Sequence, residues 1–197
     1  MTTVSEAIKK RHSARAFKDR DVDLETVKNI IQIAKQSPSG VNTQPWNVYV
    51  LSGDARDKLV NEATSRYDQG KMDGQEYLVY PKEMPDWYKE RRRAVGWAMY
   101  GAIGIEKGDT EKMMAQGRKN YEFFGAPVGI FITVKNCVGP NGWGHVGHFI
   151  QNVCLLAIEN GLATCLQEAW AELPKLVREH VDYPEDETLW CGIALGY

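Results

Sequence analysis

One long apolar segment near the C-terminal end constrains the fold more than any other feature of this sequence. Residues 145–160 are typical of a helix with a wide apolar face, and the Gly161 that follows can adopt the left-handed conformation that ends many helices. The apolar positions are Val146, Phe149, Ile150, Val153, Leu156 and Ala157. A helix of this kind buries most of its surface. We therefore expect it at the centre of the core or at an interface between subunits.

The other elements follow from the same periodicities. Further helices are expected in the opening segment up to about Arg11, after Asp23 until Pro38, and at 54–66, 86–105, 109–123 and 173–180. Thr3 and Glu6 have the spacing of a capping box. Strands are expected at 47–51, 128–134, 162–167 and 189–195. This order lacks the strict alternation of a doubly wound sheet, so we predict an α+β fold with a mixed sheet flanked by helices.

The length suits a single compact domain. The chain has 197 residues, of which 43% are apolar and 25% charged, as is ordinary for a globular protein. Segment 56–123 differs from the rest because it is rich in charge, Tyr, Trp and Met and is punctuated by Gly and Pro. We expect one domain, 1–197, in which this segment forms a helical insert or lid.

Charge and cysteine content exclude several classes of protein. A net charge of -2 gives no general attraction to nucleic acid or anionic membranes, and no apolar stretch approaches the roughly 18 residues of a membrane span. The four cysteines form no CxxC pair and stand in apolar runs, so we expect buried, reduced thiols and no metal site. MTTVSEAIKKRHSARAF lacks the apolar core of a secretory signal. A cytoplasmic protein with no nucleic-acid or membrane partner is predicted.

The run RHSAR is the first candidate binding feature. If the opening helix continues through it, Arg11 and Arg15 share one face, with the hydroxyl of Ser13 between them. Two guanidinium groups and a short donor suit a dianionic phosphate. A solvated basic helix end, favourable to the helix dipole, explains the same residues. Taken alone, the run leaves both interpretations open.

The polar loop SPSGVNTQPW, residues 37–46, is the second candidate. It joins a helix directly to a buried strand and contains two prolines, a glycine and several small or amide side chains. It could present amides and carbonyls to a flat heterocycle while Trp46 anchors it in the core. A plain connection whose polar residues cap and turn fits equally well.

Together, RHSARAF and SPSGVNTQPW resemble the N-terminal half of the FMN-dependent nitroreductase family. The resemblance continues through FGAP before a strand, the helix GHFIQNVCLLAIENGLATC and the final CGIALGY, and so spans nearly the whole chain. Segment 56–123 looks most like the branch that acts on nitrobenzoate-type compounds. The resemblance implies a nitroreductase-like fold built as an intertwined homodimer, with FMN at the interface.

The resemblance also implies which residues bind the cofactor. Arg11 and Ser13, with His12 in the same run, would hold the FMN phosphate. Arg15 would lie near the pyrimidine edge of the flavin, where a cation stabilises the negative charge of the reduced ring. The other implied contacts are Pro38, Ser39, Gly40, Asn42 and Gln44 from the partner subunit, and Asn120, Gln167, Glu168 and Ala169.

Near the last of these, a backbone N–H of either Gln167 or Glu168 would face flavin N5, the atom that carries hydride. Two departures from the family stand out. Ala169 and Trp170 replace a glycine and a smaller or different aromatic residue of many relatives. The sequence ends at Tyr197, where relatives usually continue in an arm that wraps the partner.

The implied activity is that of an NAD(P)H-dependent nitroreductase. In a ping-pong cycle, NADPH or NADH would pass hydride to the flavin and leave, and a nitroaromatic or quinone-like acceptor would take its place. No side chain is expected to act as a catalyst, and an aromatic-lined lid would suit a small flat substrate. The alternatives are a flavoenzyme of the same fold with other chemistry (dehalogenation or enone reduction), a non-catalytic flavin-binding protein and a plain α+β interaction domain.

Two further groups have open roles. His145 and His148 are three apart on one predicted helical face, but no third ligand stands nearby, so metal binding is not expected. Arg91, Arg92 and Arg93 either form an exposed helix face or attract an anion. The anion would be a substrate carboxylate or a phosphate of the nicotinamide cofactor.

Overall fold

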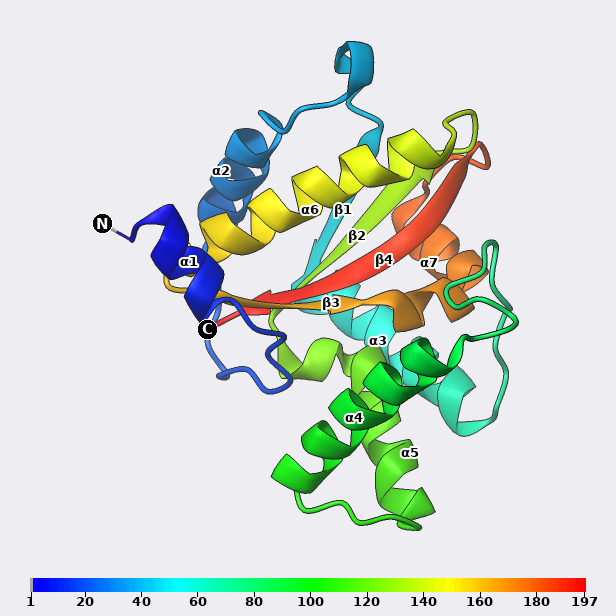
Figure 1. Cartoon of the computed structure of the whole chain (residues 1–197). Coiled ribbons are helices and arrows are strands. Elements are labelled where there is room, and N and C mark those ends of the chain that lie inside the picture. The colour runs from blue at the N-terminus through cyan, green and yellow to red at the C-terminus, as the bar shows by residue number, and fades with distance from the viewer. Residues whose placement is uncertain (1) are drawn as a thin grey trace.

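The structure, a computed structural model that describes residues 2–197, is built around one four-stranded sheet (Figure 1). Its strands are β1 (Trp46–Ser52), β2 (Val128–Lys135), β3 (Ala163–Gln167) and β4 (Glu187–Gly196). They are hydrogen-bonded in the order β1-β2-β4-β3, and each neighbouring pair is antiparallel. The expected α+β class is confirmed.

The sheet differs from the mixed one that we expected. Ser52 pairs with Val128 because the helical segment between β1 and β2 returns the chain to the end at which β1 finished. β2 must then run in the opposite direction to β1. Within residues 2–197, parallel pairing is limited to an isolated bridge between Ser13 and Thr164. The strands themselves therefore form an antiparallel sheet.

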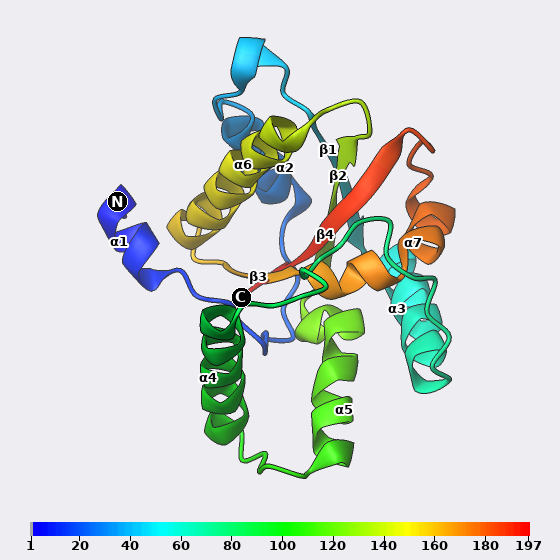
Figure 2. The same cartoon turned by 45° about the vertical axis from the view of Figure 1, so that its right-hand side comes forward.

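Helices cover both faces of the sheet. The α-helices of the described chain are α1 (Val4–Lys10), α2 (Leu24–Ala34), α3 (Gly53–Asp68), α4 (Asp86–Ala102), α5 (Thr110–Arg118), α6 (Pro140–Glu159) and α7 (Pro174–Val181). Three 3-10 helices are also present, η1 (Gly40–Asn42), η2 (Lys119–Gly125) and η3 (Glu168–Glu172). Figures 1 and 2 show α2 and α6 on one face and α3 and α7 on the other.

Local signals explain several helix ends. Thr3 and Glu6 form the expected capping box at the start of α1, and Asp23 accepts two backbone N–H groups in the first turn of α2. α6 begins at Pro140, earlier than its apolar pattern predicted, since proline is favoured in a first helical turn. Gly161, with φ of 72°, follows its end as expected.

Several predicted helices end earlier than expected, among them α2 at Ala34 instead of near Pro38 and α4 at Ala102 instead of 105. α1 stops at Lys10 and does not continue through RHSAR, and α5 stops at Arg118 although we expected a helix to residue 123. Phe123 and Phe124 have φ values of 50° and 54°, in the left-handed region. This turn buries the ring of Phe123 against Gly129 of β2, where there is no side chain. Packing against the sheet therefore ends the helical region.

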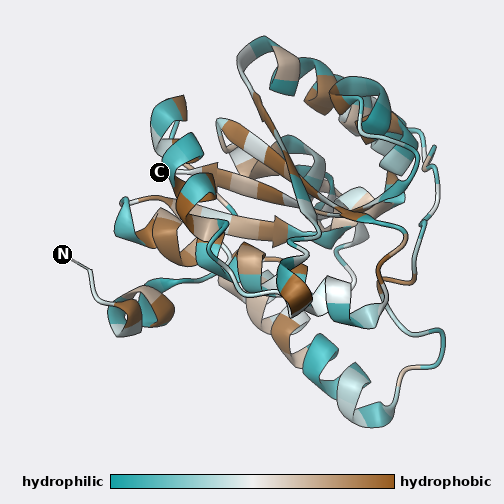
Figure 3. Ribbon diagram, turned by 90° about the horizontal axis from the view of Figure 1, so that it is seen from above, coloured by the Kyte–Doolittle hydropathy of each residue, from teal (hydrophilic) through white to brown (hydrophobic). Residues whose placement is uncertain are grey.

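The long apolar helix, α6, lies in the core of one face, as expected. Val146, Phe149 and Val153 are buried against the sheet, and the ring of Phe149 stacks on Trp46 at a centroid distance of 5.1 Å. Figure 3 shows the hydrophobic residues gathered on the strands and on the inward sides of the helices. Each fully buried large apolar side chain contributes about 1.5–3 kcal/mol to folding.

Trp170 is the centre of the core on the opposite face. It is fully buried, and its indole stacks on Phe123 at 4.8 Å and meets Phe131 edge-on at 5.1 Å. Gly192 of β4 lies directly beneath it, so a Cβ at that position would overlap the indole. The end of β3 and the start of η3 are held in place by this packing.

Helices α4 and α5 form an arm that projects from the sheet (Figure 2). Every residue of α4 is described, and none of them is buried. Val95 and Trp97 are among the exposed apolar side chains of this helix. The arm comprises two of the helices that lie within the expected insert 56–123, whereas α3, most of which lies in the same segment, packs on the sheet.

Three of the four cysteines are buried, as expected. Cys154, Cys165 and Cys191 are buried, and burial raises the pKa of the Cys165 thiol to about 11. The expectation of burial is wrong for Cys137, which is exposed because it stands in the connection between β2 and α6. No helix within 2–197 combines the length and apolarity that a membrane span needs.

The close contact between Gly192 and Trp170 gives a stability prediction. Gly192→Ala should lower the free energy of unfolding by about 1–3 kcal/mol, because the added methyl group overpacks the core. Gly101→Ala, on the exposed side of α4 with no neighbour within 4 Å, should raise it by about 0.5–1 kcal/mol. Urea unfolding monitored by circular dichroism measures both changes. An unchanged Gly192→Ala midpoint would contradict the packing described.

Candidate active site

The segment after α1 is extended and pairs with the edge of β3. The Ala14 N–H donates to the carbonyl oxygen of Thr164 at 3.0 Å, and Ser13 forms the parallel bridge to the same residue. The expectation that Arg11 and Arg15 share one helical face is therefore wrong. Pairing satisfies backbone groups at the edge of β3 and buries Ala14, which a continued helix would not achieve.

The cationic groups of this segment have no anionic partner. Among the described residues, neither Arg11 nor Arg15 forms an ion pair, and Arg15 reaches only the carbonyl oxygen of Ser13, at 3.4 Å. His12 is exposed and contacts the carbonyl oxygen of Lys10 at 3.0 Å. These guanidinium groups are thus available to an anion.

A cavity of about 400 Å³ brings together five of the predicted cofactor-binding residues. They are Arg15, Asn120, Gln167, Glu168 and Ala169. The Gln167 side-chain amide donates to the Asn120 carbonyl oxygen at 2.6 Å, which joins η2 to the end of β3. The Tyr121 hydroxyl donates to the Ala169 carbonyl oxygen at 3.2 Å and fixes the start of η3.

Burial affects two polar side chains in this cavity, those of Gln167 and Glu168. Gln167 is 1% exposed, and its Oε1 accepts no hydrogen bond from any described residue. A buried acceptor left without a donor is costly, so its presence in a binding cavity indicates a role for it there. Burial also raises the pKa of the neighbouring Glu168 carboxyl.

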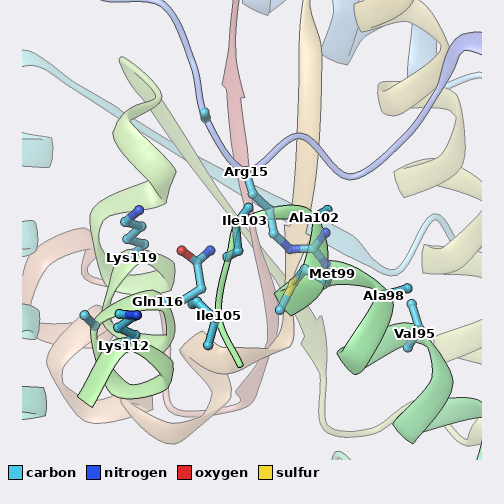
Figure 4. A pocket seen from close by; sticks show the side chains of 12 residues that line it. Arg15, Val95, Ala98, Met99, Ala102, Ile103, Ile105, Lys112, Gln116 and Lys119 are labelled. Atoms are coloured by element: carbon cyan, nitrogen blue, oxygen red, sulfur yellow. The ribbon is translucent and has the colours of Figure 1, made fainter. Parts of the chain in front are cut away.

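Arg15 lies where this cavity meets two others under the helical arm. A second cavity, of about 660 Å³, is lined mainly by apolar residues of α4 and the turn that follows it, and by polar residues of α5 (Figure 4). A third, of about 730 Å³, lies along α4 and is lined by Arg92 and Arg93 of the arginine run. The apolar side chains Met99, Ala102 and Ile103 of the second cavity were not predicted as site residues from the sequence. Their spacing of three or four in a charged helix was the available signal.

The predicted loop does not join these cavities within one chain. In Figures 1 and 2 it lies at the N-terminal end of β1, whereas the segment after α1 passes beside β3. Its members Pro38, Ser39, Gly40, Asn42 and Gln44 line none of the cavities described above. The chain thus carries two separate clusters of the predicted cofactor-binding residues.

The backbone of this loop is strained. Val41, Asn42 and Gln44 have φ values of 45°, 56° and 45°, although none is glycine, and the side chain of Val41 is 97% exposed. The Ser39 hydroxyl accepts the Gln44 N–H at 2.9 Å. Strained residues of this kind cluster at binding sites and persist where neighbouring contacts fix them.

Helix α6 provides those contacts through side chains one turn apart. His145 Nε2 accepts the Gly40 N–H at 3.2 Å, and His148 Nδ1 donates to the Pro38 carbonyl oxygen at 3.4 Å. Asn152 donates to the Ser37 hydroxyl at 2.7 Å. The two histidines thus anchor the loop. No group of three potential metal ligands occurs in the described part of the chain.

The fold and these cavities define an α+β domain with a helical arm beside a group of adjoining cavities. The profile of the nitroreductase family matches residues 8–197. The chain belongs to the nitroreductase family, as its motifs indicated.

Similar proteins cover most of the chain. A 4-nitrobenzoate reductase of Nocardioides sp. (strain LMS-CY) is 35% identical over 96% of this chain and 78% of the relative. The structure of the FMN and NADPH-dependent nitroreductase NfnB from sphigopyxis sp. strain HMH is 37% identical, with a TM-score of 0.94 over 99% of this chain and 88% of that one. NfnB from Mycobacterium smegmatis, solved in complex with NADPH, is 28% identical, with a TM-score of 0.92 over 98% and 86%.

The anchoring of the loop by α6 can be tested without a ligand. His145→Leu removes the acceptor of the Gly40 N–H, so amide hydrogen exchange in 39–44 should become about tenfold faster. His145→Gln, whose side-chain oxygen can accept the same bond, should be intermediate. Mass spectrometry of exchanged peptides measures the rates, with α3 peptides as the internal control. Equal protection in all three proteins would exclude the anchoring role.

Proposed function

We propose that this chain is a nitroreductase that binds FMN and passes hydride from NADPH or NADH to nitroaromatic or quinone-like acceptors. The observation that carries the proposal is the position of Arg15, an unpaired cation where three cavities meet above Gln167 and Glu168. Relatives of known structure described as FMN and NADPH-dependent support the choice of cofactors.

The residues present fit FMN. Arg11 and Ser13, with His12 beside them, would hold the phosphate, because guanidinium groups without acidic partners favour an oxyanion. Arg15 would face the pyrimidine edge. Buried Gln167 Oε1 lacks a donor, which suits a ligand that carries N–H groups.

Bound FMN supplies the hydride chemistry, so the chain's residues have supporting roles. Arg15 would stabilise the negative charge of the reduced ring. A backbone N–H of Gln167 or Glu168 would orient the reactive edge of the ring, and the hydrogen bond from Gln167 to Asn120 would hold the end of β3 rigid. The α4–α5 arm would act as a lid whose apolar side chains exclude water and stack on flat substrates.

We also propose an intertwined homodimer in which the loop of one subunit completes the site of the other. This loop is anchored to α6 and strained at Asn42 and Gln44, yet Pro38, Ser39, Gly40, Asn42 and Gln44 line none of their own chain's three cavities. Val4 and Ile8 of α1 and Ile33 of α2 are exposed and would be covered by a partner. Four free cysteines suit a cytoplasmic, reducing location.

The visible absorption spectrum of the purified protein tests this function. We expect flavin bands at about 450 nm that bleach on addition of NADPH under nitrogen and return on addition of 4-nitrobenzamide. Sedimentation of the same sample should give a dimer. A colourless protein that fails to take up added FMN would contradict the proposal, as would bleached flavin that no nitroaromatic compound reoxidises.

Arg15 gives a second prediction. Arg15→Gln should retain the flavin bands but lower both its reduction potential and the rate of reduction by NADPH, the latter about tenfold or more, because charge on the reduced ring loses a nearby cation. Arg15→Lys should be intermediate. Arg20→Gln, which removes an exposed arginine that lies over the Tyr197 ring, is the matched control. A potential equal to that of the wild-type protein would contradict this role.

A further inference from the structure

The third cavity, which we name the arginine cavity, is unusual in its charge. Its lining includes the side chains of Arg15, Lys89, Arg92, Arg93, Tyr80 and Trp97. Four of these six are cations, and no carboxylate is among the residues that line the cavity. A concave surface with cations of one sign raises the local concentration of anions.

The arginines of this cavity are unpaired, whereas those elsewhere have acidic partners. Arg66, Arg118 and Arg178 each lie within 3.0 Å of a carboxylate oxygen. Within the described chain, Arg92 and Arg93 lie near none at ion-pair distance. A protein with net charge -2 has acidic residues to spare, so this cluster is left open to an external anion.

Arg92 is held in position by an aromatic ring. Its guanidinium lies 4.9 Å from the centroid of Tyr80, and its Nη1 lies 3.7 Å from the sulfur of Met84. Such a contact orients the planar fork while leaving its other N–H donors free for a bidentate oxyanion. Trp97 offers an indole face in the same cavity for a flat ring.

The arginine cavity adjoins the cavity that contains Gln167, because Arg15 and Tyr80 line both. We propose that it binds a carboxylate carried on the ring of the acceptor, with Arg92 as the main contact, and so selects aromatic acids over neutral nitroaromatic compounds. This inference rests on the proposed function and specifies its substrate class.

The alternative anion is the 2′-phosphate of NADPH. That phosphate lies on the adenosine ribose, at the far end of a long molecule from the nicotinamide ring that donates hydride. The arginine cavity instead shares two lining residues with the proposed site of hydride transfer. A carboxylate on the same ring as the reacting group fits two adjoining cavities better.

Arg91 provides a matched control. It belongs to the same helix and the same basic run, but its guanidinium lies over Trp87, at 5.3 Å, and it does not line the arginine cavity. Loss of Arg91 changes the net charge as much as loss of Arg92. A difference between the two variants therefore reports position and not charge alone.

The test compares 4-nitrobenzoate with 4-nitrobenzamide, a neutral molecule of similar shape, as acceptors for the FMN-loaded full-length protein. The measured quantity is kcat/KM for 4-nitrobenzoate divided by kcat/KM for 4-nitrobenzamide. In Arg92→Met this ratio should fall about fivefold to tenfold, through a higher KM for 4-nitrobenzoate. Arg92→Lys should be intermediate, and Arg91→Met should stay within about twofold of wild type.

Salt gives an independent readout. Raising the salt concentration from about 0.05 M to about 0.3 M should lower the wild-type ratio and leave that of Arg92→Met nearly constant, because the screened interaction is already absent. An equal loss with both acceptors, or an unchanged ratio in Arg92→Met, would overturn the proposal. A higher KM for NADPH but not for NADH would assign the arginines to the cofactor phosphate and overturn it as well.

Failure of this inference is distinguishable from failure of the proposed function. Turnover of 4-nitrobenzamide by the wild-type protein, with bleaching of its flavin by NADPH, tests the function without any carboxylate. If both occur while the ratio is insensitive to Arg92, the activity stands and only the recognition of aromatic acids is rejected.

Discussion

The hydrogen bond from the Ala14 N–H to the Thr164 carbonyl oxygen, 3.0 Å long, is the contact on which the rest of the candidate site depends. It takes the chain out of α1 and lays it along the exposed edge of β3, where backbone groups would otherwise lack partners. Arg15 is thereby carried to the end of the strand that presents Gln167 and Glu168. Backbone pairing, and not a shared helical face, thus brings Arg15 to the edge of the sheet.

Helix α6 links the core to the second cluster. Its apolar face packs on the sheet, and Phe149 stacks on Trp46, the last residue of the loop. On another face, His145 and His148 hold the strained backbone of that loop. One helix thus fixes both the sheet and a loop whose conformation would be unfavourable in isolation. This arrangement would suit the proposed contact of the loop with a neighbouring subunit, because a flexible loop would lose more entropy on binding.

The arm has the opposite physical character. α4 buries none of its described residues, so its charge and aromatic content contribute little to the core. Its apolar and cationic side chains instead line two cavities that meet at Arg15. A rigid sheet with a weakly packed arm above it would separate two tasks of the proposed enzyme: the sheet would fix the position of the cofactor, and the arm could vary to suit different substrates.

The sequence by itself determined the α+β class, the central helix, most strand and helix positions and the family, because apolar periodicity and the two paired motifs are local properties. It also placed Arg15, Asn120 and Gln167 in one site through the resemblance. It did not determine that RHSAR is extended, that Phe123 turns the chain into the core or that His145 anchors a loop over one hundred residues away in the chain. Those features depend on pairing and packing between distant segments. Only the tertiary structure decided them, because the free energy of a sheet edge or a buried ring outweighs the local preference for helix.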